Sequence, residues 1–227
     1  MFETLLVRGG EPVELDAHIE RLRLSLATLY EVPVPPGTEL LVLECARELT
    51  LGRLRLTVAP NGGDAPTASV RVAEVERDVV FPPFTRAVSL TGLVVPGGLG
   101  AHKWADRALV EPVEAEGSVA LIVDDDETVL EASRGNVFIV EAGSIVTPPA
   151  DGRLLAGITR RRIIDLLPVL EQHISLLRLL AADEVFLTGS VRGVEPVGDY
   201  ESTRDWSQGA LTGVVSDLLR RRWEAGT

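Results

Sequence analysis

The residue in this sequence with the clearest capacity for covalent chemistry is Lys103, the only lysine among 22 lysine and arginine residues. An arginine guanidinium stays protonated and forms no Schiff base, whereas a lysine amine shifts its pKa readily and can attack a carbonyl carbon. Lys103 follows the glycine-rich run Pro96-Gly97-Gly98-Leu99-Gly100. We interpret Lys103 as a candidate nucleophile. The alternative is that a sequence biased toward arginine retains one lysine by chance.

The composition and the net charge limit the class of protein. The 227 residues include 45% hydrophobic and 25% charged side chains, which suits one large or two modest globular domains. The formal net charge of −12 repels nucleic acids and anionic membranes unless a local basic patch overcomes it. We therefore expect a small molecule as the partner, with no nucleic acid and no membrane.

The single cysteine and the start of the sequence bear on disulfides, metal sites and the cellular compartment. The single cysteine, Cys45, cannot support a disulfide framework and fits a helical apolar pattern, so we expect it in a core. No group of cysteine and histidine residues has the spacing of zinc ligands, and no metal site is predicted. The sequence opens with a strand-like run, and no stretch approaches the roughly 18 apolar residues of a membrane span. We expect a cytoplasmic protein.

In the first part of the chain, helical patterns and strand patterns follow one another. Alternating apolar residues predict strands, and apolar residues three or four apart predict helices. His18 and Arg21 lie one turn apart on the first helix, and that spacing alone is typical of a solvated helix face. The expected elements are a strand at 2–8, a helix from an N-cap at Asp16 to about Tyr30, a helix from Thr38 to Leu49, a hairpin of 53–58 and 68–72 around a turn at 60–63, and a strand at 87–93.

Beyond Lys103, strand patterns dominate. A helical pattern covers 104–115, and Pro112 is expected to kink or end that helix because it lacks an amide donor. The fold class is therefore expected to be α+β, with a small mixed α/β lobe at 1–94, an interdomain loop at 95–101 and a larger lobe at 102–227. The remaining expected elements are strands at 119–123, 128–132, 136–141 and 184–187, helices at 158–167, 175–180 and 207–222, a turn at 188–190 and an extended segment at 191–197.

A series of short motifs occurs in one order along nearly the whole chain. Each motif is weak evidence singly, but the ordered set resembles the class IV aminotransferase family, the fold-type IV pyridoxal-phosphate enzymes. The motifs are Phe2-Glu3-Thr4, Asp16-Ala17-His18-Ile19-Glu20-Arg21-Leu22, His102-Lys103, Glu131-Ala132-Ser133-Arg134-Gly135-Asn136, Thr147-Pro148-Pro149, Leu155-Ala156-Gly157-Ile158-Thr159-Arg160 and Asp183-Glu184-Val185-Phe186-Leu187-Thr188-Gly189-Ser190-Val191.

The resemblance implies a chemical role for Lys103 and for Glu131. Lys103 would bind pyridoxal 5'-phosphate covalently through its amine and later shuttle protons as a general acid and base, while the cofactor acts as the electron sink. Glu131 would keep the pyridine nitrogen protonated, which needs an adjacent carboxylate. Without Lys103, an ordinary exposed glutamate on an alternating strand would be the simpler interpretation of Glu131.

The resemblance also implies a binding site for the cofactor phosphate. A guanidinium can bind phosphate in a bidentate manner, and the start of a helix offers free amides and the positive end of the dipole. Asn136 and His18 belong to the family pattern as residues that support the shape of the site. The plain alternative is that Thr159 and Ser190 are a cap residue and a turn residue. The residues assigned to the phosphate are Arg21, Gly157, Ile158, Thr159, Ser190 and Val191.

The sequence also departs from the family pattern. Relatives usually carry further strands before the segment that matches Phe2, so we expect a first lobe that is shortened at its start. Many relatives place an arginine where this chain has Ala59-Pro60-Asn61-Gly62, and the Arg-x-His pattern of D-amino-acid transaminases is missing nearby. The resemblance implies a homodimer in which the neighbouring subunit helps to close the active site.

Within the family, the Phe2-Glu3-Thr4 run is more similar to lyase and D-amino-acid members than to branched-chain transaminases, which usually have Phe-Glu-Gly. We therefore expect an aminodeoxychorismate lyase activity, which eliminates pyruvate to give 4-aminobenzoate for folate biosynthesis. A branched-chain or D-amino-acid transaminase is the alternative. A third alternative, a non-catalytic descendant that binds a ligand, is disfavoured by the presence of both Lys103 and Glu131.

Overall fold

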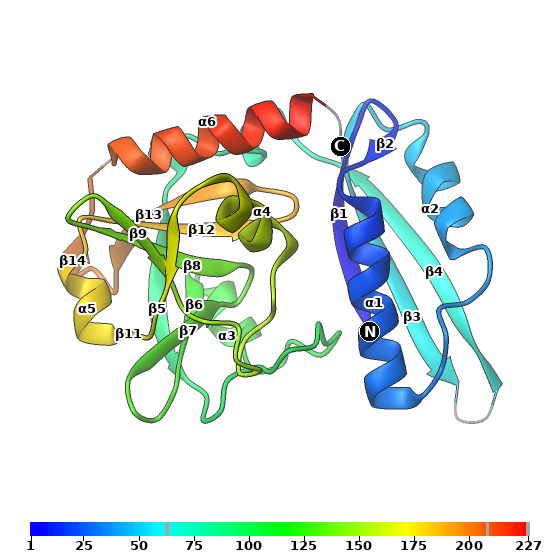
Figure 1. The fold of residues 1–227 in the computed structure, drawn as a ribbon, viewed down its shortest axis with the longest axis horizontal. Coiled ribbons are helices and arrows are strands. Elements are labelled where there is room, and N and C mark those ends of the chain that lie inside the picture. Colours follow the sequence, from blue (N-terminus) through cyan, green and yellow to red (C-terminus); the bar gives the residue numbers. More distant parts are fainter. Residues whose placement is uncertain (62–63, 208, 226–227) are drawn as a thin grey trace. The chain divides into compact units, whose positions relative to one another are not determined.

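The computed structural model describes residues 1–61, 64–207 and 209–225, and the chain divides into two compact units (Figure 1). The first unit comprises Met1–Val80 and His102–Ala105, and the second comprises Phe81–Ala101 and Asp106–Ala225. This division differs from the expected lobes, because it puts the segment around Lys103 with the first unit and the segment after Val80 with the second. Both units combine helices with antiparallel-rich sheets, so the α+β fold class is confirmed.

The first unit is built on a four-stranded antiparallel sheet in the order β2-β1-β3-β4. The strands are β1 (Phe2–Arg8), β2 (Glu11–Pro12), β3 (Leu51–Asn61) and β4 (Asp64–Glu74). β3 and β4 form the expected hairpin and are longer than expected. Gly62 and Gly63 of the expected turn lie outside the described residues.

Helices α1 (Leu15–Tyr30) and α2 (Thr38–Ala46) pack on this sheet and share its apolar core (Figure 1). Cys45 is partly buried against this core, as expected. Because β1 contributes alternate residues to the core, its remaining residues lie on the opposite face of the sheet. The fully buried side chains of the core are Leu5, Val7, Leu22, Leu26, Val42, Ala46, Leu54, Leu56 and Val58.

The N-terminal cap of α1 was wrongly predicted. The N-cap is Glu14, in a left-handed conformation with φ of 58°, and Asp16 lies within the first turn. A carboxylate in the first turn is favourable near the positive end of the helix dipole without being the cap, which explains why the pattern was misleading. The second helix ends at Ala46, before the expected Leu49.

The second unit contains a 10-stranded sheet in the order β10-β9-β8-β12-β13-β5-β6-β7-β11, with β14 paired to β13. The strand β5, which was expected in the first lobe, lies in this sheet because it pairs in parallel with β6 and β13. The strands are β5 (Val88–Val94), β6 (Val119–Val123), β7 (Thr128–Ala132), β8 (Asn136–Glu141), β9 (Ser144–Thr147), β10 (Val169–Glu171), β11 (Ile174–Ser175), β12 (Glu184–Gly189), β13 (Gly193–Tyr200) and β14 (Arg204–Asp205).

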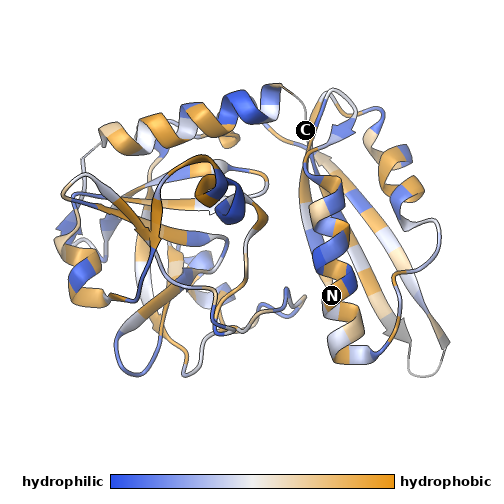
Figure 2. Ribbon diagram, in the orientation of Figure 1, coloured by the Kyte–Doolittle hydropathy of each residue, from blue (hydrophilic) through white to orange (hydrophobic). Residues whose placement is uncertain are grey.

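Several helices accompany this sheet. α6 packs on β12, β13 and α4, and its last turns are hydrophilic (Figure 2). No helix of the described residues is long and apolar enough to cross a membrane. The helices of this unit are η2 (Phe84–Arg86), α3 (Glu111–Ala115), α4 (Ile158–Leu166), α5 (Leu176–Ala181) and α6 (Ala210–Glu224), and the first unit adds η1 (Arg77–Val79).

Two further expectations for this part of the chain were wrong. The helix expected over 104–115 is confined to Glu111–Ala115, and Pro112 lies at its start, where a missing amide donor costs least. The turn expected at 188–190 lies later, because Thr188 and Gly189 continue β12 and pair with Val194 and Gly193. The turn therefore occupies 190–192.

Candidate active site

Lys103 lies in the first unit and is held beside β1. Its carbonyl oxygen accepts a hydrogen bond of 3.3 Å from the amide of Phe2, and its Nζ lies 4.9 Å from the centroid of the Phe2 ring. The preceding residue, His102, places its Nδ1 3.0 Å from Oγ of Ser25 on α1. The backbone and the neighbouring ring thus fix the lysine segment to the start of the sheet and to α1.

A buried carboxylate joins β1 to α1. Glu3 is 1% exposed, and its Oε2 lies 2.7 Å from Nδ1 of His18. Arg21 donates from Nε to Oε1 at 2.9 Å and from Nη2 to Oε2 at 2.5 Å. The structure therefore brings the expected residues His18 and Arg21 together through Glu3, whose role the sequence analysis did not identify. An acidic residue on the core-facing side of a strand was the available signal.

The charges in this group follow from burial and from the neighbouring cation. Burial raises the pKa of Glu3, but the charge of Arg21 and the hydrogen bonds from His18 and Arg21 outweigh it and hold that pKa at about 2. Burial lowers the pKa of His18, and Glu3 only partly opposes that shift. At neutral pH the carboxylate is therefore ionised and the imidazole is neutral. The charge of Lys103 also acts on His18.

Glu131 lies in the second unit, on β7. It is 6% exposed, and its Oε1 accepts a hydrogen bond of 3.3 Å from the amide of Leu155. β7 is buried over most of its length, so the interpretation of Glu131 as an exposed residue on an alternating strand is wrong. Burial on a strand and the contact with Leu155 hold this carboxyl group in a fixed position.

Asn136, the first residue of β8, shapes the loop that leads into α4. Its Nδ2 donates to the carbonyl oxygen of Leu155 at 2.8 Å. A Cβ atom on Gly157 would lie 2.0 Å from Oδ1 of Asn136, so any larger residue there would have to displace the Asn136 side chain. Because Glu131 and Asn136 bind the amide and the carbonyl of Leu155, they set where α4 begins.

The start of α4 carries a group of buried or partly buried polar residues. Gly157 is the N-cap, and the first turn contains no acidic residue. Thr159 in that turn is buried. The amides of a first helical turn have no partner within the helix, and with the dipole they favour an anion.

The other two residues that were expected at the phosphate lie elsewhere in the second unit. Ser190 and Val191 lie partly buried in the turn after β12.

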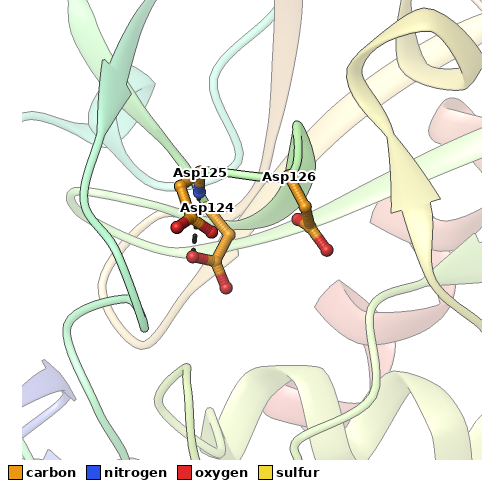
Figure 3. Close-up of side chains that lie close together, drawn as sticks. All are labelled: Asp124, Asp125 and Asp126. Atoms are coloured by element: carbon orange, nitrogen blue, oxygen red, sulfur yellow. Dashed lines mark hydrogen bonds between the residues drawn. The ribbon is translucent and has the colours of Figure 1, made fainter.

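An acidic turn fixes the glycine-rich segment that precedes Lys103 in the sequence. Asp124, Asp125 and Asp126 lie close together between β6 and β7 (Figure 3). Asp124 accepts hydrogen bonds of 2.9 Å from the amides of Gly97 and Asp125, and one of 3.0 Å from Arg153. These hydrogen bonds hold the pKa of Asp124 at about 2. This carboxylate is thus committed to contacts within the protein.

The comparisons with known proteins identify the family. The pattern of the amino-transferase class IV family matches residues 1–91 and 103–200, which is more than half of the chain. The chain therefore belongs to the class IV aminotransferase family, and it is a pyridoxal-phosphate-dependent enzyme, as the sequence motifs indicated.

The similar sequences include both transaminases and a lyase. The chain is 27% identical over 225 residues to a probable branched-chain-amino-acid aminotransferase of Thermotoga maritima, covering 87% of the chain and 76% of that protein. It is 26% identical over 247 residues to the aminodeoxychorismate lyase of Vibrio harveyi, covering 93% and 88%. A match to the mitochondrial branched-chain-amino-acid aminotransferase 1 of Arabidopsis thaliana is 36% identical but covers 44% of the chain and 28% of that protein.

Solved structures share the fold. The PLP-bound form of a hypothetical aminotransferase from Mycobacterium tuberculosis has a TM-score of 0.84 at 24% identity, covering 99% of this chain and 89% of that chain. The 4-amino-4-deoxychorismate lyase of Pseudomonas aeruginosa has a TM-score of 0.75 at 27% identity, covering 97% and 90%. These likenesses confirm the fold-type IV architecture.

The residues present fit pyridoxal phosphate. The second unit offers uncharged donors for an anion at the start of α4 and, at Thr188, a buried hydroxyl without a hydrogen-bond partner among the described residues. It also offers the buried carboxyl group of Glu131. Seven of the expected site residues belong to the second unit: Glu131, Asn136, Gly157, Ile158, Thr159, Ser190 and Val191.

Proposed function

We propose that this chain is an aminodeoxychorismate lyase, which removes pyruvate from 4-amino-4-deoxychorismate to leave 4-aminobenzoate for folate synthesis. The observation that carries the proposal is a basic face of the first sheet. Phe2 and Thr4 lie on the face opposite the helices, and Arg55 of β3 pairs with Thr4. The Arg55 guanidinium carbon lies 3.9 Å from the centroid of the Phe2 ring, and Lys103 Nζ lies 4.9 Å from the same centroid.

Cationic groups close to Lys103 favour a substrate that carries carboxylates. Arg71 of β4 pairs with Arg55, so both lie on the same face of the sheet. A guanidinium binds a carboxylate in a bidentate manner, and aminodeoxychorismate carries carboxylates where a branched-chain amino acid has an apolar side chain. Thr4, at the position where branched-chain transaminases usually have glycine, supports the same choice. The alignment with the Vibrio harveyi lyase over most of both chains adds support.

Each site residue has a role in this proposal. The cofactor, when bound, supplies the electron sink. Lys103 holds the cofactor through its amine and moves a proton at Nζ as general acid and base. Glu131 offers its carboxylate to the pyridine nitrogen and keeps it protonated. Asn136 and His18 hold neighbouring groups in place. The residues that bind the phosphate are Arg21, Gly157, Ile158, Thr159, Ser190 and Val191.

The second candidate function is a branched-chain or D-amino-acid transaminase, which the alignment with the Thermotoga maritima protein favours. The two reactions differ in what they need. A transaminase must pass the amino group to a keto acid, whereas a lyase releases pyruvate without a keto acid. We further propose that the enzyme is a cytoplasmic homodimer.

The decisive experiment incubates the holoenzyme separately with aminodeoxychorismate and with L- and D-amino acids plus a keto acid. Pyruvate released from aminodeoxychorismate alone supports the lyase. Amino-group transfer to the keto acid, with no release of pyruvate from aminodeoxychorismate, would replace it by the transaminase. Arg55→Gln should raise KM for aminodeoxychorismate roughly 10-fold, since it removes a charge-assisted hydrogen bond. The matched control is Arg23→Gln, which removes the same charge from the exposed side of α1.

A further inference from the structure

Thr188 carries a buried hydroxyl that the fold itself does not use. Thr188 lies on β12, is 2% exposed, and its Oγ1 has no hydrogen-bond partner among the described residues. A buried hydroxyl without a partner destabilises the folded protein, so native structures pair nearly all such groups with protein, water or ligand. An unpaired hydroxyl of this kind indicates a partner from outside the chain.

The strand register places this hydroxyl beside the start of α4. Thr188 pairs with Asn136 across β12 and β8, so the two side chains lie on the same face of the sheet as neighbours. Oδ1 of Asn136 in turn lies against Gly157, the N-cap of α4. On the other side along the strands, the stacked rings of Phe138 and Phe186 fill the same face, with centroids 5.0 Å apart. The polar end of this face is therefore the end toward the α4 N-terminus.

The groups at the start of α4 indicate which class of ligand could pair with the Thr188 hydroxyl. The first turn of α4 has no acidic residue, and its amides and dipole favour a negative charge. Arg160, in that turn, donates from Nη2 to the carbonyl oxygen of Pro148 and to Glu171, at 2.8 Å and 2.6 Å, while its Nε is buried without a hydrogen-bond partner among the described residues. The donors at this position are thus backbone amides, hydroxyls and the Nε of Arg160. Such a set suits the oxygens of a phosphate group.

We propose that Thr188 is a further phosphate ligand, whose hydroxyl donates a hydrogen bond to the phosphate of pyridoxal 5'-phosphate. The proposal rests on the cofactor assignment made above. It adds a residue that lies before the turn of Ser190 and Val191. It also accounts for a hydroxyl that has no hydrogen-bond partner among the described residues although it is buried on β12.

The test compares Thr188→Val, which keeps the shape and removes the hydroxyl, with Thr188→Ser, which keeps the hydroxyl. For the apoprotein, the midpoint of thermal unfolding of Thr188→Val should equal or exceed that of the wild type, because the valine removes an unpaired polar group. Its affinity for pyridoxal phosphate should fall roughly 10-fold or more, as for the loss of a hydrogen bond to a charged group. Thr188→Ser should stay within a few-fold of the wild type.

A second ligand shows which part of the cofactor Thr188 contacts. Pyridoxal, which lacks the phosphate, should bind Thr188→Val and the wild type equally. Equal affinity of both proteins for pyridoxal phosphate would overturn the proposal, and so would an equal loss with pyridoxal. A clear drop in the apoprotein unfolding midpoint of Thr188→Val would show that a bound water already pairs the hydroxyl, and would also overturn it. A wild type that binds no pyridoxal phosphate would instead contradict the cofactor assignment.

Discussion

The side-chain oxygen of Asn136 occupies the space that a Cβ atom on Gly157 would need, at a distance of 2.0 Å. The same asparagine holds Leu155 through its amide group, so one side chain fixes both the loop and the N-cap of α4. The start of the helix is therefore positioned by packing as well as by hydrogen bonding.

Gly157→Ala should destabilise the apoprotein, because the new methyl group must displace Asn136 from a buried position. We expect a loss of about 1–3 kcal/mol in the free energy of unfolding, as for overpacking of a core. Urea denaturation measures it. The control is Gly213→Ala in α6, where a Cβ atom meets nothing within 4 Å and a gain of about 0.5–1 kcal/mol is expected. Equal stability of Gly157→Ala and the wild type would contradict the tight contact.

Lys103→Ala should be unable to bind the cofactor covalently, although phosphate contacts could still retain it. Borohydride reduction of the wild-type holoenzyme followed by peptide mapping should find the cofactor on the Lys103 peptide, and no other lysine exists in the chain. The N-terminal amine serves as the control peptide. Cofactor fixed at that amine, or at no lysine peptide, would refute the central chemical assignment.

Glu131→Gln should retain the cofactor but slow turnover, because a neutral amide does not stabilise a protonated pyridine nitrogen as a carboxylate does. The expected loss in kcat is on the order of 100-fold, as for the removal of one electrostatic contact from an active site. Cofactor affinity should change much less than kcat. Titration with pyridoxal phosphate and steady-state kinetics on the same preparations separate these quantities. Full activity in Glu131→Gln would make the residue a structural one.

The buried Glu3 should make the free energy of unfolding depend on pH in the acidic range. The pKa of Glu3 in the folded protein is about 2, below its usual value of 4.5, so the folded state holds fewer protons than the unfolded state between these values. Its contribution of about 3 kcal/mol is present above pH 4.5 and is lost as the pH falls toward 2. The stability difference between the wild type and Glu3→Gln should therefore shrink over that range. Urea denaturation at pH 5, 4 and 3 measures it.

Glu20→Gln is the matched control for this pH effect. Glu20 lies on α1 and pairs with Arg23, but both side chains are more than half exposed, so solvent screens the pair. Its removal should leave the pH profile nearly unchanged. His18 acts in the same direction as Glu3, since its lowered pKa means that protonation below its usual value of 6.5 destabilises the fold. A wild-type profile parallel to that of Glu3→Gln would refute the assigned charge state.

The proposed homodimer predicts a particle of twice the chain mass. An isologous contact that buries at least roughly 1,000 Å² in total should persist at micromolar concentration. Light scattering on the holoenzyme measures the mass, and dilution with parallel activity assays tests whether assembly matters. A monomer that turns over substrate at the full rate would remove the need for any contribution from a second subunit.

The long strands and helices were predictable because their patterns are local. β1, β6, β7 and β8 follow the expected ranges closely, since their apolar residues occur at strand spacing. Short strands such as β11 and β14 could not be predicted, because pairs of residues carry no periodicity and form only where a partner strand is available. The helix expected over 104–115 failed for a related reason: an apolar spacing was present, but only its last part became helical.

The residues of the candidate site were also predictable only in part. Motif order pointed to Lys103, Arg21 and Glu131, because those residues carry chemistry that few positions can replace. Glu3 and Thr188 were not assigned roles, since their importance depends on what lies opposite them in the sheet. A buried carboxylate under α1 and an unpaired hydroxyl on β12 become visible only when the strand register and the packing are known.

The assignment of His102–Ala105 to the first unit has a consequence for biosynthesis and for protein engineering. A fragment that ends at Val80 contains all the strands of the first sheet, yet the amide of Phe2 loses the carbonyl of Lys103. On the ribosome, the first unit therefore cannot be completed until β5, the glycine-rich segment and His102–Ala105 have been synthesised. Any attempt to exchange the first unit between relatives has to transplant a discontinuous insert, with the short lysine peptide as its second piece.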